Sequence, residues 1–390
     1  MSYSNLPSGL FPFVSIVVPA YNAERFIART LDSALAQDYA STEIIVVDDG
    51  STDRTAEIVE SYRAADARIR LISTENQGVA AARNTGIAAS RGSLVAFLDA
   101  DDLWARNKLR LQVGALQDNP AAAAAYVWSI AIDEDDGVIA PLPNWQFDGF
   151  SLCRHLLTWP VGNGSALLVR KEAALAVRGY DSEYRRVKCG GAEDLDFELR
   201  LAELFQMVCV PQVLVGYRNY PGNMSSDRER MARAGIMVIE RALGRNPNIP
   251  ARYANWIRAK VFRYAAESLR DERALRSAYH YLVMVWLDGR LGLELAAGFG
   301  RKIIGRLKRL TAGREARLTV ARARDGIVPV PFSAWIDANR ERATRLEPDR
   351  RVAMLETCDR RLGGRRDPLA HASREPGREV SASRGGHAAP

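Results

Sequence analysis

The sequence predicts an α/β fold in which a mostly parallel sheet is flanked by helices and followed by an α-helical extension. Apolar runs rich in β-branched residues alternate with segments of helical period over residues 14–99. Such repeats favour parallel strands joined by right-handed crossovers. The runs are apolar throughout, as in strands that are covered on both faces. Beyond residue 228 the period is helical alone.

The first hundred residues are expected to hold four strands and three helices. The first helical segment places Phe26 and Leu31 on one face. The second follows Ser51 and Asp53, either of which can cap a helix, and the third is an Ala-rich run after Gly78. We expect strands at 14–19, 43–48, 69–73 and 93–99, and helices at 24–37, 54–65 and 78–90.

The pattern becomes less regular after Trp104. Residues 145–160 are predicted to be irregular and then helical, and the loop at 219–227 is polar. We expect helices at 105–118 and 191–204, strands at 121–133 and 207–218, and a strand followed by a helix within 162–177.

The chain has 390 residues and a net charge of +7 that is unevenly distributed. Residues 301–390 contain 21 Lys and Arg against 11 Asp and Glu, a net charge of +10, so the first 300 residues carry −3. A basic end can bind nucleic acid or an anionic membrane surface, or it can be solvated and partly disordered. Because no aromatic residues are interleaved with the basic ones, nucleic acid is not expected as a partner.

The sequence lacks a membrane span, a signal peptide and CxxC pairs, and these features bear on the expected cellular compartment. The most apolar stretch, 281–300, is interrupted by charges, so no membrane span is expected. The basic stretch 301–310 can lie on a membrane as an amphipathic segment or pack as an ordinary helix. No signal-peptide pattern is present, and four cysteines without a CxxC pair fit a reducing compartment. We therefore expect a cytoplasmic protein, either free or in peripheral contact with the inner face of the plasma membrane.

Polar residues follow three of the predicted strands, and the segments are "PAYN" (19–22), "DDGS" (48–51) and "DADD" (99–102). The carboxyl ends of parallel strands meet at one edge of a sheet, where ligands bind. Repulsion among Asp99, Asp101 and Asp102 would be relieved by a divalent cation, which takes one or two carboxylates together with phosphate oxygens. Because the histidines and cysteines are dispersed, oxygen ligands remain, and these suit Mg²⁺ or Mn²⁺.

These segments, in this order and spacing, resemble the family 2 glycosyltransferases. The resemblance lies in "VSIVVPAYNAERFIARTLDSALAQDYASTEIIVVDDGSTDRT", "NQGVAAARNTGIAASRGSLVAFLDADD" and "GAEDLDFELRLA". It is strong over residues 14–102, weaker to residue 226 and absent afterwards. Members are inverting, nucleotide-sugar-dependent enzymes with a GT-A fold. The resemblance therefore implies a nucleotide-diphosphate sugar donor, with UDP favoured, a glycan, lipid-linked glycan or other hydroxyl acceptor, and Mg²⁺ or Mn²⁺.

The resemblance, together with the helical period after residue 228 and the composition of the end of the chain, indicates a division of the chain. Acceptor specificity would lie largely in residues 126–161. The expected parts are a lead at 1–12, a GT-A domain at 13–227 with a nucleotide-binding half at 13–104 and an acceptor half at 105–227, a helical extension at 228–358, and a basic, disordered tail at 359–390.

Carried over residue by residue, the resemblance implies a donor site at the strand ends. Asp49 would accept a hydrogen bond from an N–H of the base, Asp101 would bind the metal, and Asp99 would reach the ribose or sugar. Asn84 would stand near the sugar-phosphate region, and Asp102 would give local support. The implied donor-binding residues are Pro19, Ala20, Tyr21, Asp49, Arg83, Asp99, Ala100, Asp101 and Arg218, and the implied metal-binding residues are Asp101 and Asp99.

A second acidic site is "GGAEDLDFELR". Inverting transfer needs one base that removes the acceptor proton as the hydroxyl attacks. Asp194 matches the catalytic base of the family, and Glu193 would orient the acceptor or the base and help to raise its pKa. From these residues alone, without the upstream motifs, the helix macrodipole is the preferred explanation for acids at a helix N-terminus.

The loop from Tyr217 occupies the place of a lid over the diphosphate in relatives. Arg218 would pair with phosphate there, or it would be a solvent-exposed arginine. Relatives often carry a His near this loop, whereas this chain has Asn219 and Tyr220. A QxxRW motif is absent, so the sequence predicts an enzyme that adds one or few sugars per encounter rather than a processive synthase.

Two other functions remain open from the residues. A nucleotidyltransferase on a similar sheet should carry a Gly-rich phosphate loop after the first strand, which "PAYNAERF" lacks. A catalytically inactive, glycosyltransferase-like binding protein should have lost one acid among Asp49, Asp101 and Asp194, and all three are present.

Overall fold

The computed structural model describes residues 12–270, 273–289, 330–339 and 350–363. The strands are β1 (Val14–Ala20), β2 (Thr42–Asp48), β3 (Ile69–Ser73), β4 (Leu94–Phe97), β5 (Leu103–Trp104), β6 (Ala122–Ile132), β7 (Val138–Pro141), β8 (Leu167–Arg170) and β9 (Gln206–Arg218). The helices are α1 (Ile27–Leu35), α2 (Thr55–Ala65), α3 (Val79–Ala89), α4 (Lys108–Asp118), α5 (Leu152–Thr158), α6 (Lys171–Ala176), α7 (Glu183–Arg186), α8 (Glu193–Leu204), α9 (Arg228–Arg245), α10 (Ala251–Ser268), α11 (Ala274–Leu287), α14 (Phe332–Asn339) and α15 (Arg350–Gly363).

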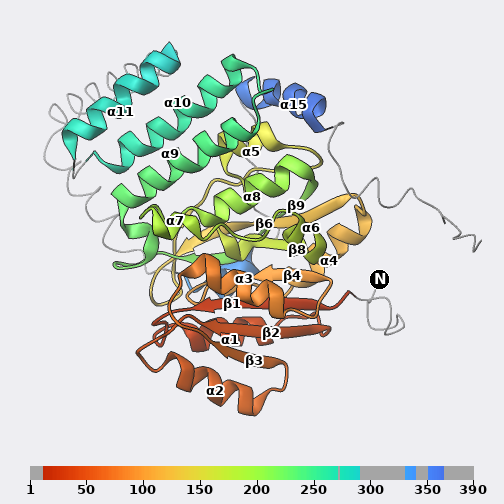
Figure 1. Ribbon diagram of the computed structural model, residues 1–390. Helices are drawn as coiled ribbons and strands as arrows, with labels where there is room; N and C mark the ends of the chain where they lie inside the picture. Colours follow the sequence, from red (N-terminus) through yellow and green to blue (C-terminus); the bar gives the residue numbers. More distant parts are fainter. Residues whose placement is uncertain (1–11, 271–272, 290–329, 340–349, 364–390) are drawn as a thin grey trace, which may run out of the picture.

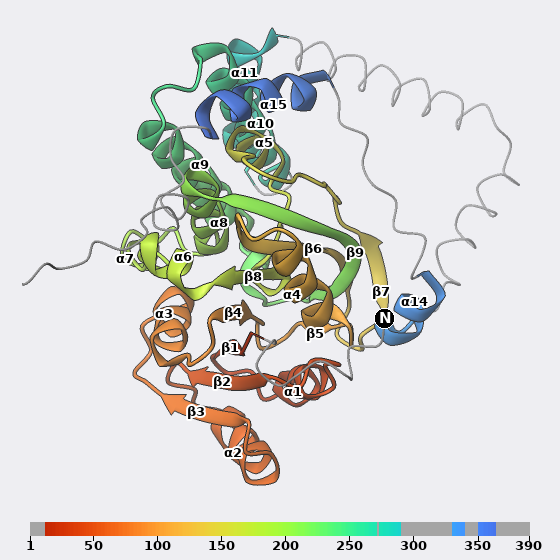
Figure 2. The same cartoon turned by 90° about the vertical axis from the view of Figure 1, so that its right-hand side faces the viewer.

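The strands form one sheet in the order β3-β2-β1-β4-β8-β6-β9-β5, with β7 paired to β6. Strands β1 to β4 are parallel to one another, as the sequence predicts. Figure 2 shows α1 and α3 on opposite sides of these strands, which explains why every residue of β1, β2 and β4 is buried. The predicted α/β fold class is confirmed.

The second half of the sheet is mixed. Strand β8 runs antiparallel to both β4 and β6, whereas β9 is parallel to β6 and antiparallel to β5. An apolar run does not encode strand direction, so the sequence pattern did not reveal this change. It also did not predict β5 and β7, because runs of two and four residues are too short to show a period.

Helices α9, α10 and α11 form a layer at one end of the molecule, with α10 packed between the other two. Strand β3 and helix α2 lie at the opposite end in Figure 1. Of the predicted helical extension, residues 290–329 and 340–349 lie outside the described residues, as do the lead up to residue 11 and the tail from residue 364.

Helix α15 corrects the predicted start of the disordered tail. Residues 359–363 were assigned to that tail, but they complete α15, which packs on α5. Asp359 is buried, accepts a hydrogen bond from the N–H of Cys153 at 2.5 Å, and pairs with Nε of Arg154 at 2.7 Å. Leu355 and Cys358, on the preceding turns of α15, are also buried. The Gly- and Arg-rich composition of residues 359–390 as a whole did not indicate that its first residues continue this helix.

The Asp359→Ala substitution is therefore expected to lower the free energy of unfolding by about 1–3 kcal/mol, because Arg154 and the Cys153 N–H lose their acceptor. Urea denaturation measures the change. Glu356→Ala, on the exposed side of the same helix, serves as the control. Equal effects of the two substitutions would contradict the docking of α15 through Asp359.

Candidate active site

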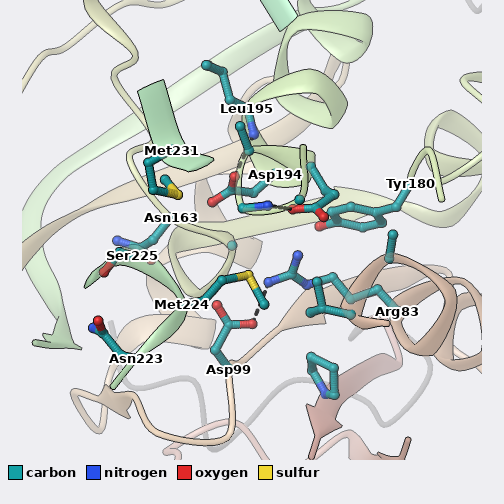
Figure 3. Close-up of a pocket in the computed structure, with 18 of the residues that line it drawn as sticks. Arg83, Asp99, Asn163, Tyr180, Asp194, Leu195, Asn223, Met224, Ser225 and Met231 are labelled. Atoms are coloured by element: carbon teal, nitrogen blue, oxygen red, sulfur yellow. Dashed lines mark hydrogen bonds and ion pairs between the residues drawn. The ribbon is translucent and has the colours of Figure 1, made fainter. Parts of the chain in front are cut away.

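A pocket of about 1210 Å³ lies between the carboxyl ends of the parallel strands and the start of α8 (Figure 3). Its lining includes every residue for which the sequence predicts a role in donor, metal or base chemistry, except Arg218 and Asn84. The sheet brings these residues together because β1, β2 and β4 are parallel neighbours, so the segments that follow them open at one edge.

Asp49 follows β2 and is buried at the pocket wall. Its Oδ1 accepts the N–H of Gln77 at 2.8 Å, and its Oδ2 accepts the N–H of Gly78 at 2.7 Å. The carboxylate thereby fixes the loop that enters α3. Each oxygen has a second lone pair, which leaves capacity for a ligand donor. Tyr21, after β1, lines the same end and is half exposed.

The three acids after β4 have different surroundings. Asp99 accepts a hydrogen bond from Nη2 of Arg83 at 2.6 Å. Asp102 is buried and accepts the N–H of Arg218 at 2.9 Å and the hydroxyl of Ser165 at 2.5 Å, so it supports the loop from below. Burial, and then the negative charge of Asp99, raise the pKa of Asp101 to about 6. Burial, together with the charges of Asp101 and Asp99, also raises the pKa of Asp102 well above its ordinary value. Asp101 differs from Asp102 in that it lines the pocket.

Arg83 lies between the two acidic sites, and Figure 3 shows its guanidinium between Asp99 and Asp194. It projects from α3, is buried, and stands 5.0 Å from the centre of the Tyr180 ring. Among the described residues, its Nε has no hydrogen-bond partner. The arginine thus links the strand-end acids electrostatically to the first turn of α8.

Asp194 stands at the start of α8 and faces the pocket. Burial raises its pKa to about 7; the positive charge of Arg83 and the Leu195 N–H oppose the shift, and the charges of Asp99 and Glu193 add to it. Its Oδ1 accepts the N–H of Leu195 at 2.8 Å. A carboxylate with this pKa is suited to accept a proton near neutral pH.

The neighbouring acids of α8 have structural partners. Glu193 is buried and accepts the N–H of Gly191 at 2.7 Å. Asp196 pairs with Arg200 at 2.7 Å and with Arg245 at 3.4 Å, outside the pocket lining. The helix N-terminus is therefore already served by two acids, so the macrodipole alone does not account for Asp194.

Two predicted positions are corrected by the structure. Arg218 is buried beneath the acidic loop, because β9 continues through residue 218 and the loop begins only after it. Its Nε donates to the carbonyl of Asp101 at 2.6 Å, and its Nη2 pairs with Asp136 at 2.5 Å. It does not line the pocket. Asn84 likewise turns away from the pocket and holds the backbone of Tyr180 through two hydrogen bonds of 2.7 and 2.8 Å.

The sequence did not single out the residues of the far end of the pocket. The rings of Trp159 and Tyr264 meet edge to face there, 5.2 Å apart, and Met231 lies nearby. Tyr264 and Met231 come from α10 and α9, so the helical extension forms part of the wall. Because these residues are isolated in sequence and come from an irregular segment and two helices, no local motif marked them.

The donor set at the strand ends fits a hard divalent cation. Asp99 and Asp101 both line the pocket and offer only oxygen. A cation beside Asp101 would offset the repulsion from Asp99 that helps to raise the pKa of Asp101. Within the part of the chain that the structure describes, no group of three or more His, Cys, Asp or Glu could hold a metal by itself. A cation here would therefore be shared with oxygen atoms of a ligand.

For a reaction in which Asp194 must be ionised, Arg83→Met is expected to shift the acid limb of the profile of kcat/KM against pH to higher pH. The guanidinium charge holds the pKa of Asp194 down, so its removal should raise that pKa and require a higher pH to ionise the carboxyl group. The profile of kcat/KM against pH measures this shift. A lower rate with an unmoved acid limb would contradict the coupling between Arg83 and Asp194.

Parallel strands with acids at their ends, completed by a mixed half that closes over one pocket, form the GT-A architecture. The structure resembles that of TarS from S. aureus in complex with UDP-GlcNAc, with a TM-score of 0.54 and 19% identity over 70% of this chain and 79% of that chain. It also resembles a mannosyltransferase from Pyrobaculum calidifontis in complex with GDP-Man and Mn²⁺, with a TM-score of 0.50 and 18% identity over 90% of this chain and 88% of that chain.

Residues 15–172 match the family described as Glycosyl transferase family 2. The chain therefore contains a family 2 glycosyltransferase domain. A relative in Escherichia coli, the UDP-Glc:alpha-D-GlcNAc-diphosphoundecaprenol beta-1,3-glucosyltransferase WfgD, is 43% identical over 107 residues, which are 27% of this chain and 42% of that protein. The chain spans between about a quarter and a half of the length of the curated relatives it matches.

Residues 290–300 of the most apolar stretch lie outside the described residues. Among the described helices, none combines the length and the apolar character needed to cross a bilayer.

Proposed function

We propose that this protein transfers a sugar from a nucleotide-diphosphate donor, with UDP favoured, to a hydroxyl group of a glycan or lipid-linked glycan, with inversion at the anomeric carbon. The observation that carries this proposal is that one pocket joins the strand-end acids Asp49, Asp99 and Asp101 to Asp194. Its volume of about 1210 Å³ exceeds the usual 300–1,000 Å³ of ligand pockets, which leaves room for two substrates.

The donor would lie along the strand ends. The base would rest against Pro19, Ala20 and Tyr21, with Asp49 accepting from an N–H of the base. The diphosphate would face Ala100, Asp101 and Arg83. Mg²⁺ or Mn²⁺ held by Asp101 and Asp99 would neutralise charge on the diphosphate leaving group when bound. The mannosyltransferase complex with Mn²⁺ supports this assignment by analogy of fold.

Asp194 would act as the base. The acceptor oxygen forms a bond to the anomeric carbon, the bond from that carbon to the diphosphate oxygen breaks, and the acceptor proton passes to the Asp194 carboxylate. Glu193, held by the N–H of Gly191, would fix the turn that presents Asp194. Arg83 would keep Asp194 ionised near neutral pH, because it opposes the shift caused by burial.

The acceptor would enter from the end of the pocket formed by Trp159 and Tyr264. Aromatic rings offer apolar faces that suit the C–H face of a sugar ring. The assignment of a lipid-linked acceptor is favoured by the relative WfgD, whose name describes a diphosphoundecaprenol-linked acceptor. Peripheral membrane contact through the basic C-terminal segment belongs to this proposal, although residues 301–329 and 364–390 lie outside the described residues.

Calorimetric titration of UDP, GDP, CDP and TDP into the full-length protein, with and without Mn²⁺, tests the donor site. We expect binding of one nucleotide that depends on the metal. The matching nucleotide sugars, screened with candidate acceptors, then test transfer, and NMR of the product's anomeric configuration tests inversion. A folded protein that binds none of the four nucleotides would overturn the proposal.

A further inference from the structure

Helix α11 carries a stripe of exposed apolar side chains. Leu275, Tyr279, Leu282 and Trp286 are 89%, 61%, 72% and 84% exposed. Their spacing of four, three and four residues places them in one line along the helix. We call these four residues the α11 stripe.

The opposite face of α11 is the one that packs on the protein. Ser277 and Met284 are buried, and the hydroxyl of Ser277 donates to the carbonyl of Ala266 on α10 at 2.7 Å. The α11 stripe therefore points away from α10. Figure 1 shows α11 as the outermost helix of the α9–α11 layer, at the end of the molecule opposite β3.

The composition of the stripe matches a membrane interface. Five of the twelve large apolar side chains that are exposed in the described part of the chain belong to α11, so the patch is concentrated rather than scattered. Trp and Tyr have amphipathic rings that settle at the level of lipid head groups, while Leu side chains enter the acyl boundary. A single helix with this face lies in the plane of a bilayer rather than across it.

The distribution of charge indicates which kind of surface the stripe meets. Residues 1–227 contain 20 Lys and Arg against 29 Asp and Glu, a net charge of −9. Residues 228–329, which include α9 to α11 and the chain that follows α11, contain 22 Lys and Arg against 9 Asp and Glu, a net charge of +13. An anionic surface would attract the part of the chain that carries the stripe and repel the domain that holds the pocket.

We propose that the protein docks on an anionic lipid bilayer through α11, with Leu275, Tyr279, Leu282 and Trp286 inserted at the boundary between head groups and acyl chains. This docking rests on the peripheral membrane contact that belongs to the proposed function and assigns a surface to it. It also has a geometric consequence for the pocket, because α10, on which α11 packs, contributes Tyr264 to the acceptor end. The bilayer would thus lie on the helical side of the pocket, where a lipid-linked acceptor would arrive.

The test is sedimentation of the full-length protein with vesicles of phosphatidylcholine, either pure or mixed with phosphatidylglycerol. We expect binding to the mixed vesicles that weakens with added salt. The double substitution Leu282→Glu and Trp286→Glu should lower the apparent affinity by about tenfold or more, because two inserted apolar groups are replaced by acids. Leu175→Glu is the matched control, since Leu175 is 54% exposed on α6.

Three results would overturn the proposal. The first is a wild-type protein that binds neither kind of vesicle, or a double variant that binds as the wild type does. The second is a wild-type dimer that the double substitution dissociates without a loss of vesicle binding, which would make the stripe an interface between two copies. The third is a melting temperature lowered far more than by Leu175→Glu, which would mean that the chain itself covers the stripe. Nucleotide binding by the double variant, measured in parallel, should be unchanged. A protein that binds nucleotide but does not bind vesicles would therefore reject the docking proposal and leave the proposed function standing.

Discussion

Replacing Asp194 by Asn is expected to lower the rate of sugar transfer by about 10²- to 10⁴-fold, the usual contribution of a positioned general base. The amide cannot take the proton that the acceptor hydroxyl loses, whereas nucleotide binding at the strand ends should persist. Initial rates and nucleotide titrations on the same variant measure the two properties separately. In the wild-type protein, the rate should fall as the pH drops through about 7, because the Asp194 carboxyl group then becomes protonated.

The control for Asp194 is Glu172→Gln. Glu172 also lies in the first turn of a helix, α6, but outside the pocket lining. If these acids serve only the helix macrodipole, the two substitutions should have similar, small effects on the rate. A variant Asp194→Asn with nearly full activity would reject the assignment of the base.

The same substitution is expected to raise thermal stability. The pKa of Asp194 is about 7 in the folded protein and about 3.9 in an unfolded chain. The unfolded chain therefore loses its proton first, and ionisation lowers stability as the pH rises between these values. Asp194→Asn should raise the melting temperature above pH 7 and leave it nearly unchanged at pH 4, as calorimetry at the two pH values would measure.

Replacing Asp101 by Asn is expected to weaken nucleotide binding in the presence of Mn²⁺ by about 100-fold, the upper end of what the loss of a metal-supporting group costs. Asp101 lines the pocket. Asp99, which also lines it, already pairs with Arg83, and Asp102, which is held by Arg218 and Ser165, does not line it. Calorimetric titrations with and without Mn²⁺ measure the loss.

The matched control is Asp135→Asn, which removes the same charge from an exposed position outside the pocket. That variant should bind the nucleotide as the wild type does. If Asp101→Asn retains metal-dependent binding, the cation is held elsewhere and the assignment of Asp101 fails. If both variants lose binding equally, the effect reflects the net charge of the surface rather than a ligand at this position.

Much of the first half of the fold could be predicted, because its signals are local. The apolar runs predicted as strands coincide with β1 to β4 within one or two residues. The helices between them imply parallel pairing, and parallel pairing brings the strand-end acids together. The predicted start of the tail at residue 359 was less accurate. The burial of Asp359 depends on Arg154 and Cys153, which are more than 200 residues away in the chain.

The order and spacing of local motifs were enough to point to the residues that we propose carry the chemistry of this protein. The acids after β2 and β4 and at the start of α8 stand in segments whose order and spacing are those of the family. The local alternation of strands and helices brings the acids after β2 and β4 to one edge of the sheet. The position, the partners and the burial of each of these groups follow from the tertiary structure alone. It buried Arg218 under the acidic loop, set Arg83 between Asp99 and Asp194, and closed the pocket with Trp159 and Tyr264. These three placements depend on contacts between segments that are distant in the sequence. The burial and the pKa of a side chain follow from such contacts and not from the local sequence.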